Sequence, residues 1–126
     1  MNDSDRKALK RQYLESHRPA GVFRVRNRVD DRSYVASSVN LPASFNKLRM
    51  QLDTGSFLML PELQRDWKRL GGDAFDFEVL EELEPPDAPE WDPREDLAAL
   101  EALWLEQLEP WGERGYNRKP RALPRG

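Results

Sequence analysis

The sequence predicts an α+β domain with a small three-stranded antiparallel sheet flanked by helices. Short segments in which apolar and polar residues alternate indicate strands, and longer segments with apolar residues at helical spacing indicate helices. After a basic N-terminal segment, their order is strand, strand, helix, helix, strand, helix, which is typical of a sheet with helices packed against it. The 126 residues suit one domain. We expect a basic helical extension over 1–19, the domain itself over 20–117 and a basic tail over 118–126.

The first predicted elements precede residue 40. Residues 4–16 predict a basic helix with a thin apolar stripe. Two strands are expected near 21–27 and 33–38, because apolar side chains alternate with polar or basic ones in both segments. Asp30 and Asp31 mark the turn between them, so the second strand should be the antiparallel partner of the first.

Two helices should follow the strand pair. The first begins at Asn40, a good N-cap, with Pro42 in its first turn, and ends at Gly55. Its buried face should consist of Leu41, Phe45, Leu48 and Leu52. The second helix begins near Pro61 and ends at Gly71 and Gly72. Its apolar face should consist of Leu60, Leu63, Trp67 and Leu70.

A third strand and a last helix complete the expected domain. Alternation over 75–80 predicts the strand, and an acidic, proline-rich loop follows over 84–93. Asp92 and Pro93 open the last helix, whose inward residues should be Leu97, Leu100, Trp104 and Leu108. We expect the following side chains to be mostly buried: Phe23, Val25, Val35, Phe45, Leu48, Leu63, Trp67, Phe77, Leu100 and Trp104.

The composition excludes several classes of function. Cysteine is absent, which excludes disulfides, thiol nucleophiles and iron–sulfur sites. The single histidine, His17, leaves no ordinary Ser-His-Asp triad and no His-rich zinc site. No apolar stretch approaches the length of a membrane span or a secretory signal. We therefore expect a cytoplasmic protein whose chemistry comes from Tyr, Asp, Glu, Lys, Arg and a borrowed metal ion.

Charge is segregated along the chain. Residues 1–52 carry eleven basic and five acidic side chains, 53–117 carry five and eighteen, and 118–126 carry four basic ones. Basic ends around an acidic middle suggest contact with a polyanion through selected faces, although a highly charged surface also serves solubility. Because alternate side chains of a strand share a face, Arg24, Arg26 and Arg28 should lie together.

Several short motifs occur in the order found in one known family. Gly21-Val22-Phe23 is followed by a basic stretch and then by Tyr34-Val35-Ala36-Ser37-Ser38. Further along come Val39-Asn40-Leu41, Leu63-Gln64-Arg65-Asp66-Trp67, Phe75-Asp76-Phe77-Glu78-Val79-Leu80, Glu101 with Trp104, and Gly115-Tyr116-Asn117. Together they resemble a divergent GIY-YIG nuclease domain over about residues 20–117. A resemblance to a nuclease fold does not by itself establish nuclease activity.

The resemblance implies hydrolysis of phosphodiester bonds with one divalent cation, Mg²⁺ or Mn²⁺. Glu101 matches the glutamate that holds the metal, Tyr34 a tyrosine that positions or activates the attacking water, and Asn117 the asparagine that supports the site. The implied partner is nucleic acid, with DNA favoured. A cation neutralises phosphoryl oxygens and lowers the pKa of bound water, and a side chain then relays the proton.

Three positions depart from the family pattern. Phe23 stands where a second tyrosine is expected, and Ala36 replaces a glycine. Ser44 occupies the position of an arginine that steadies the phosphate, with Leu48 where a histidine is often seen one turn later. Since such an arginine is worth roughly 10³–10⁵ in rate, the departures predict a slow enzyme unless Arg24, Arg26 or Lys47 replaces it.

Three interpretations of function remain open. The first is a divalent-metal-dependent endonuclease. The second is a catalytically weakened module that binds nucleic acid, and the third is a protein-interaction domain. For either of the first two, we expect salt-sensitive binding of nucleic acid through residues 6–11 and the basic tail from Arg118. The candidate contacts within the domain are Arg24, Arg26, Arg28, Lys47 and Arg49.

Overall fold

The computed structural model describes residues 19–84 and 91–119. The expected basic helix, residues 85–90 of the proline-rich loop and the tail beyond residue 119 lie outside the described residues. Within them, the elements occur in the predicted order. They are β1 (Ala20–Asn27), β2 (Arg32–Ser38), α2 (Leu41–Thr54), α3 (Pro61–Leu70), β3 (Phe75–Leu83) and α4 (Pro93–Leu108), with short 3₁₀ turns η1 (Gly72–Ala74) and η2 (Gly112–Arg114).

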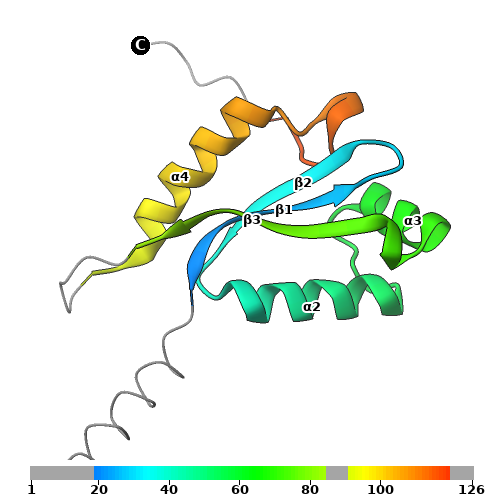
Figure 1. Cartoon of the computed structure of the whole chain (residues 1–126), viewed down its shortest axis with the longest axis horizontal. Coiled ribbons are helices and arrows are strands. Elements are labelled where there is room, and N and C mark those ends of the chain that lie inside the picture. Colours follow the sequence, from blue (N-terminus) through cyan, green and yellow to red (C-terminus); the bar gives the residue numbers. More distant parts are fainter. Residues whose placement is uncertain (1–18, 85–90, 120–126) are drawn as a thin grey trace, which may run out of the picture.

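The three-stranded antiparallel sheet is confirmed. Its strand order is β2-β1-β3, so β1 is central and pairs antiparallel with both neighbours. The β1–β2 hairpin aligns Val25 with Tyr34 and Phe23 with Ala36. Helices α2 and α3 cover one face of the sheet and α4 covers the other (Figure 1). An α+β domain with helices on both faces of a small sheet is therefore the observed architecture.

The helix ends follow from local chemistry. The side chain of Asn40 accepts a hydrogen bond from the backbone N–H of Ala43, which satisfies one of the free donors at the start of α2. Gly55 ends that helix with φ of 77°, in the left-handed region that glycine adopts without strain. Asp92 caps α4 through the N–H of Arg94. These bounds agree with the sequence prediction because capping depends on adjacent residues.

The main core lies between the sheet and the α2–α3 pair. Phe23 and Val25 of β1 pack there with Leu48, Leu63 and Trp67, all of them buried as predicted. The ring of Trp67 lies 4.9 Å from that of Phe75, centroid to centroid, and its Nε1 donates to the Asp53 carboxylate. The α2–α3 side therefore contains most of the apolar burial that stabilises the domain.

The face beneath α4 is less apolar than predicted. Of the inward residues expected on this helix, Leu97 is buried, whereas Leu100 and Trp104 are half-buried. The strand positions on this face alternate between apolar Val22 and Val35 and polar residues, so the apolar area available to α4 is small. Phe45 and Phe77, also expected to be mostly buried, are half-buried at the edge of the main core.

The segment after α4 returns to the sheet and is held by a buried polar network. The hydroxyl of Tyr116 donates to the Asp66 carboxylate at 2.7 Å and accepts from the amide of Asn27 at 2.9 Å. Gly115 forms a parallel bridge with Ser33, and a Cβ at this glycine would collide with the carbonyl of Pro110. This network fixes the residues that follow Tyr116 against the edge of β2.

Candidate active site

Residues from three elements meet in a pocket between β1, β2 and α2. Phe23, Tyr34, Ser44 and Lys47 line this pocket, whose volume is about 190 Å³. Phe23 and Tyr34 are on neighbouring strands, with their rings 6.1 Å apart in an edge-to-face arrangement. The positions matched to the two tyrosines and the arginine of the family are therefore brought together, although two of the three carry different side chains. We call this the β2–α2 pocket.

Tyr34 is the only hydroxyl-bearing aromatic residue lining the β2–α2 pocket. Its ring is half-buried, and burial is the main cause that raises the pKa of its hydroxyl above the usual value of 10. The negative charge of Glu101 raises this pKa further. Tyr34 is consequently protonated at neutral pH and can donate a hydrogen bond.

Glu101 lies on α4 and approaches β2 from the face of the sheet opposite to α2. It is half-buried on α4, and its Oε1 accepts a hydrogen bond from the backbone N–H of Ser37 at 2.9 Å. Ser37 lies three residues after Tyr34 on β2. The carboxylate is thereby held at the β2 edge with one oxygen anchored.

The side chains at this edge can bind a magnesium or manganese ion through one carboxylate, but they do not form a preformed metal site with several protein ligands. In residues 19–84 and 91–119, no group of three or more His, Asp or Glu side chains lies close enough to hold a metal. Mg²⁺ is commonly held by one or two carboxylates, with water and substrate phosphate completing its coordination. The single carboxylate of Glu101 is compatible with that mode of binding.

Asn117 supports β2 through both polar atoms of its side chain. Its Oδ1 accepts from the N–H of Val35 and its Nδ2 donates to the C=O of Val35, both at 2.8 Å. The side chain thus pairs with the free edge of β2 as a further strand would. Because Val35 adjoins Tyr34, Asn117 is placed to fix the position of Tyr34, and its own polar groups are already used.

At the start of α2, the family's arginine position is occupied by a small side chain. Ser44 hydrogen-bonds to the hydroxyl of Ser38, which also accepts from the N–H of Asn40. Leu48, one turn later, is buried in the core. Neither position therefore supplies a positive charge to a phosphate.

Most of the predicted basic contacts are already paired with acids. Arg24 donates to Glu78, with 3.0 Å between its Nε and the carboxylate. Arg26 donates to Asp31 at 3.1 Å, and Arg28 lies 3.5 Å from Asp76. The guanidinium of Arg49 lies over the ring of Phe77 at 4.6 Å. Of the five basic candidates, Lys47 is the one that lines the β2–α2 pocket.

Sequence reasoning missed several residues of this region. Ser37 contributes a backbone N–H, Ser38 contributes a hydroxyl, and Phe57 and Met59 line the pocket from the loop between α2 and α3. A backbone N–H has no sequence signature. Phe57 and Met59 reach the β2–α2 pocket only because α3 folds back beside α2 (Figure 1).

The fold resembles that of endonuclease catalytic domains of the GIY-YIG type. No family model matches the sequence, and no curated protein matches it. Among solved structures, the catalytic domain of the homing endonuclease I-TevI is similar, with a TM-score of 0.63 and 22% identity over 80% of this chain and 99% of that one. A single-residue mutant of the same catalytic domain gives 0.64 and 20% over 79% and 92%. The chain therefore has the GIY-YIG fold. In the described residues, no helix is both long and apolar enough to cross a membrane.

Proposed function

We propose that the chain is a slow, divalent-metal-dependent nuclease that hydrolyses phosphodiester bonds in nucleic acid, with DNA as the favoured substrate. The observation that carries this proposal is that Tyr34 and Lys47 line the β2–α2 pocket, while Glu101 accepts a hydrogen bond from the backbone N–H of Ser37, which lines the same pocket. The three side chains offer a hydroxyl donor, a cation and a metal ligand, which are the groups that phosphodiester hydrolysis needs. The fold shared with an endonuclease catalytic domain supports the same conclusion.

Each side chain has a distinct role in the proposed reaction. Glu101 would hold Mg²⁺ or Mn²⁺, which supplies neutralisation of the phosphoryl oxygens and a bound water of lowered pKa. Tyr34, protonated at neutral pH, donates a hydrogen bond that orients the attacking oxygen. Lys47 attracts the phosphate to the β2–α2 pocket as a point charge. Asn117 touches none of the reacting groups and positions β2.

The substituted positions account for the slow rate. Lys47 cannot contact two phosphate oxygens in one plane as an arginine can. Phe23 contributes an aromatic edge against Tyr34 but has no hydroxyl. A general acid or base contributes roughly 10²–10⁴ in rate. The loss of one hydroxyl and of the arginine therefore lowers the expected rate of cleavage.

Cleavage of supercoiled plasmid tests the proposal. We expect nicking with Mg²⁺ or Mn²⁺ and none with chelator. Glu101→Gln should abolish the nicking while preserving the acceptor for Ser37, because the amide oxygen can replace Oε1. Glu106→Gln, an exposed change on the same helix, is the matched control and should cut as the wild type does. Nicking that survives in Glu101→Gln would show that the site is elsewhere.

A module that binds nucleic acid without cutting it is the second candidate. The pairing of Ser44 with Ser38 favours it, since this part of α2 is already satisfied without a phosphate. On this alternative, the protein binds DNA with strong salt dependence but leaves the plasmid intact with either metal.

A further inference from the structure

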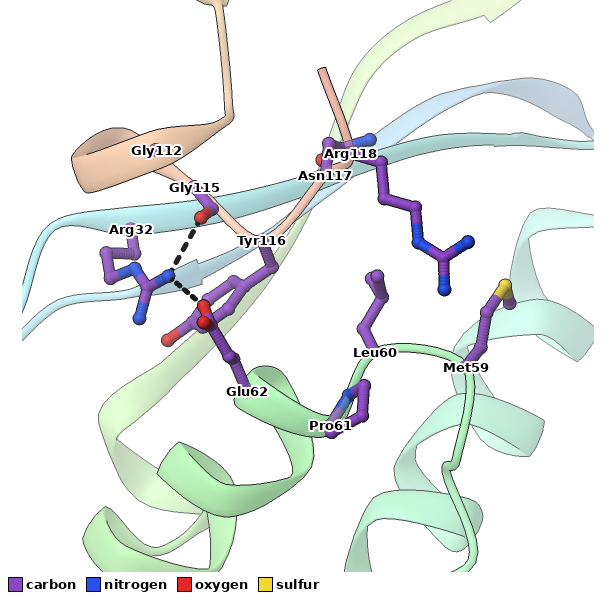
Figure 2. Close-up of a pocket in the computed structure, with 10 residues that line it drawn as sticks. All are labelled: Arg32, Met59, Leu60, Pro61, Glu62, Gly112, Gly115, Tyr116, Asn117 and Arg118. Atoms are coloured by element: carbon purple, nitrogen blue, oxygen red, sulfur yellow. Dashed lines mark hydrogen bonds and ion pairs between the residues drawn. The ribbon is translucent and has the colours of Figure 1, made fainter. Parts of the chain in front are cut away.

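A second, larger pocket adjoins the β2–α2 pocket. It has a volume of about 400 Å³ and lies between the start of α3 and the segment that follows α4. Figure 2 shows Arg32, Tyr116 and Arg118 on one side and Met59, Leu60 and Pro61 on the other. Met59 lines both pockets, so the two are neighbours. We call this second one the α3 pocket.

Two arginines line the α3 pocket, and they differ in their partners. Arg32 donates to the Glu62 carboxylate and, at 3.0 Å, to the carbonyl of Gly115, and its guanidinium lies 4.4 Å from the centre of the Tyr116 ring. Its charge is therefore compensated. Arg118 is exposed, and no acidic side chain of the described residues lies within ion-pair distance of it. Within residues 19–84 and 91–119, the α3 pocket thus presents one guanidinium without an acidic partner.

Apolar side chains face this guanidinium across the pocket. In Figure 2 the guanidinium of Arg118 points toward Leu60 and Met59. Met59 is 61% exposed, whereas Leu60 is buried in the main core. A cation beside the exposed apolar side chain of Met59 matches a ligand with both an anionic group and a flat apolar one, as a nucleotide has.

The backbone fixes Arg118 relative to the proposed catalytic residues. Arg118 directly follows Asn117, whose side chain is bonded to β2 at Val35. Val35 in turn adjoins Tyr34 in the β2–α2 pocket. A strand that places a phosphate at Tyr34 and continues past Met59 therefore reaches Arg118.

We propose that the α3 pocket is a subsite for one unpaired nucleotide of the strand bound at the β2–α2 pocket. Arg118 binds the phosphate of this nucleotide, and the exposed side chain of Met59 contacts the face of its base. The base has to be unpaired, because stacking and pairing cover its faces and edges within a duplex. A volume of about 400 Å³ suits a ligand of this size. The inference rests on the proposed function and specifies its substrate as single-stranded or locally opened nucleic acid.

Binding measured in chelator tests the subsite without requiring cleavage. The probes are a fluorescein-labelled single-stranded oligodeoxynucleotide of about 12 nucleotides and the duplex of the same sequence. Arg118→Gln should weaken single-strand binding about tenfold and reduce the slope of log K against log salt by about 0.7, with duplex binding unchanged. Met59→Ala should weaken single-strand binding and leave the slope as it is.

Arg65→Gln is the matched control. It removes the same charge from an exposed position on α3 outside the α3 pocket, so the slope should stay that of the wild type. The inference is overturned if Arg118→Gln behaves like this control, if it weakens single-strand and duplex binding equally, or if the wild type does not bind single strands at low salt. A wild type that binds with the Arg118 effect but never cuts would reject only the nuclease. Cutting that depends on Glu101 but not on Arg118 would reject only the subsite.

Discussion

Replacing Asn117 with alanine should lower the free energy of unfolding by about 2 kcal/mol. The substitution removes two hydrogen bonds of 2.8 Å that the side chain makes with the N–H and C=O of Val35. Each such bond contributes about 1 kcal/mol net. Val35 is only 1% exposed, so water does not readily replace the lost partner. The same loss frees the edge of β2 beside Tyr34, so any cleavage should fall as well.

Urea denaturation followed by tryptophan fluorescence measures this change. With a slope of about 2 kcal/mol per molar urea, the midpoint should fall by about 1 M. Asn46→Ala, an exposed change on α2, serves as the control and should leave the midpoint in place or raise it slightly, because alanine favours a helix over asparagine. Asn117→Asp should also be destabilising, because it keeps the acceptor for the Val35 N–H but sets a carboxylate against the Val35 carbonyl. An Asn117→Ala protein as stable as the wild type but unable to cut would refute the positioning role and imply direct contact with substrate.

Three other predictions concern the candidate site and its ionisable groups. Ser44→Arg should raise plasmid cleavage about tenfold or more, equivalent to about 1.4 kcal/mol off the barrier, because a guanidinium contacts two phosphate oxygens; cleavage that stays at background favours the binding module. Glu101→Gln should lower the pKa of the Tyr34 hydroxyl, because it removes the negative charge that raises this pKa. Alkaline titration followed by tyrosinate absorbance measures the shift, and an unchanged titration would contradict the interaction. Burial raises the pKa of Tyr34 and Tyr116 in the folded state, so their stabilising contribution is complete below about pH 10 and is lost as pH rises above it. Urea unfolding between about pH 9 and pH 11 should show that loss, and a flat profile would contradict it.

The sequence by itself determined the elements, their order and most of their bounds. Asn40 and Gly55 set the ends of α2 because a cap and a left-handed turn involve only residues close in the chain. The alternation in β1 and β2, with turn residues Asp30 and Asp31 between them, indicated an antiparallel hairpin for the same reason. The motifs also pointed to Phe23, Tyr34 and Ser44 as one group, and these residues line one pocket.

Only the tertiary structure decided which charged side chains are paired and which groups the candidate site residues contact. Arg24 and Glu78 are 54 positions apart, so their ion pair exists only once β3 lies beside β1. Asn117 and Val35 are 82 positions apart, so the two hydrogen bonds between them exist only once the segment after α4 lies beside β2. Such contacts depend on how separate elements pack, and no local pattern encodes a partner supplied by a distant strand or helix. Short-range interactions therefore determine the helices and strands. Long-range packing pairs Arg24, Arg26 and Arg28 with acidic residues and places Lys47 in the lining of the β2–α2 pocket.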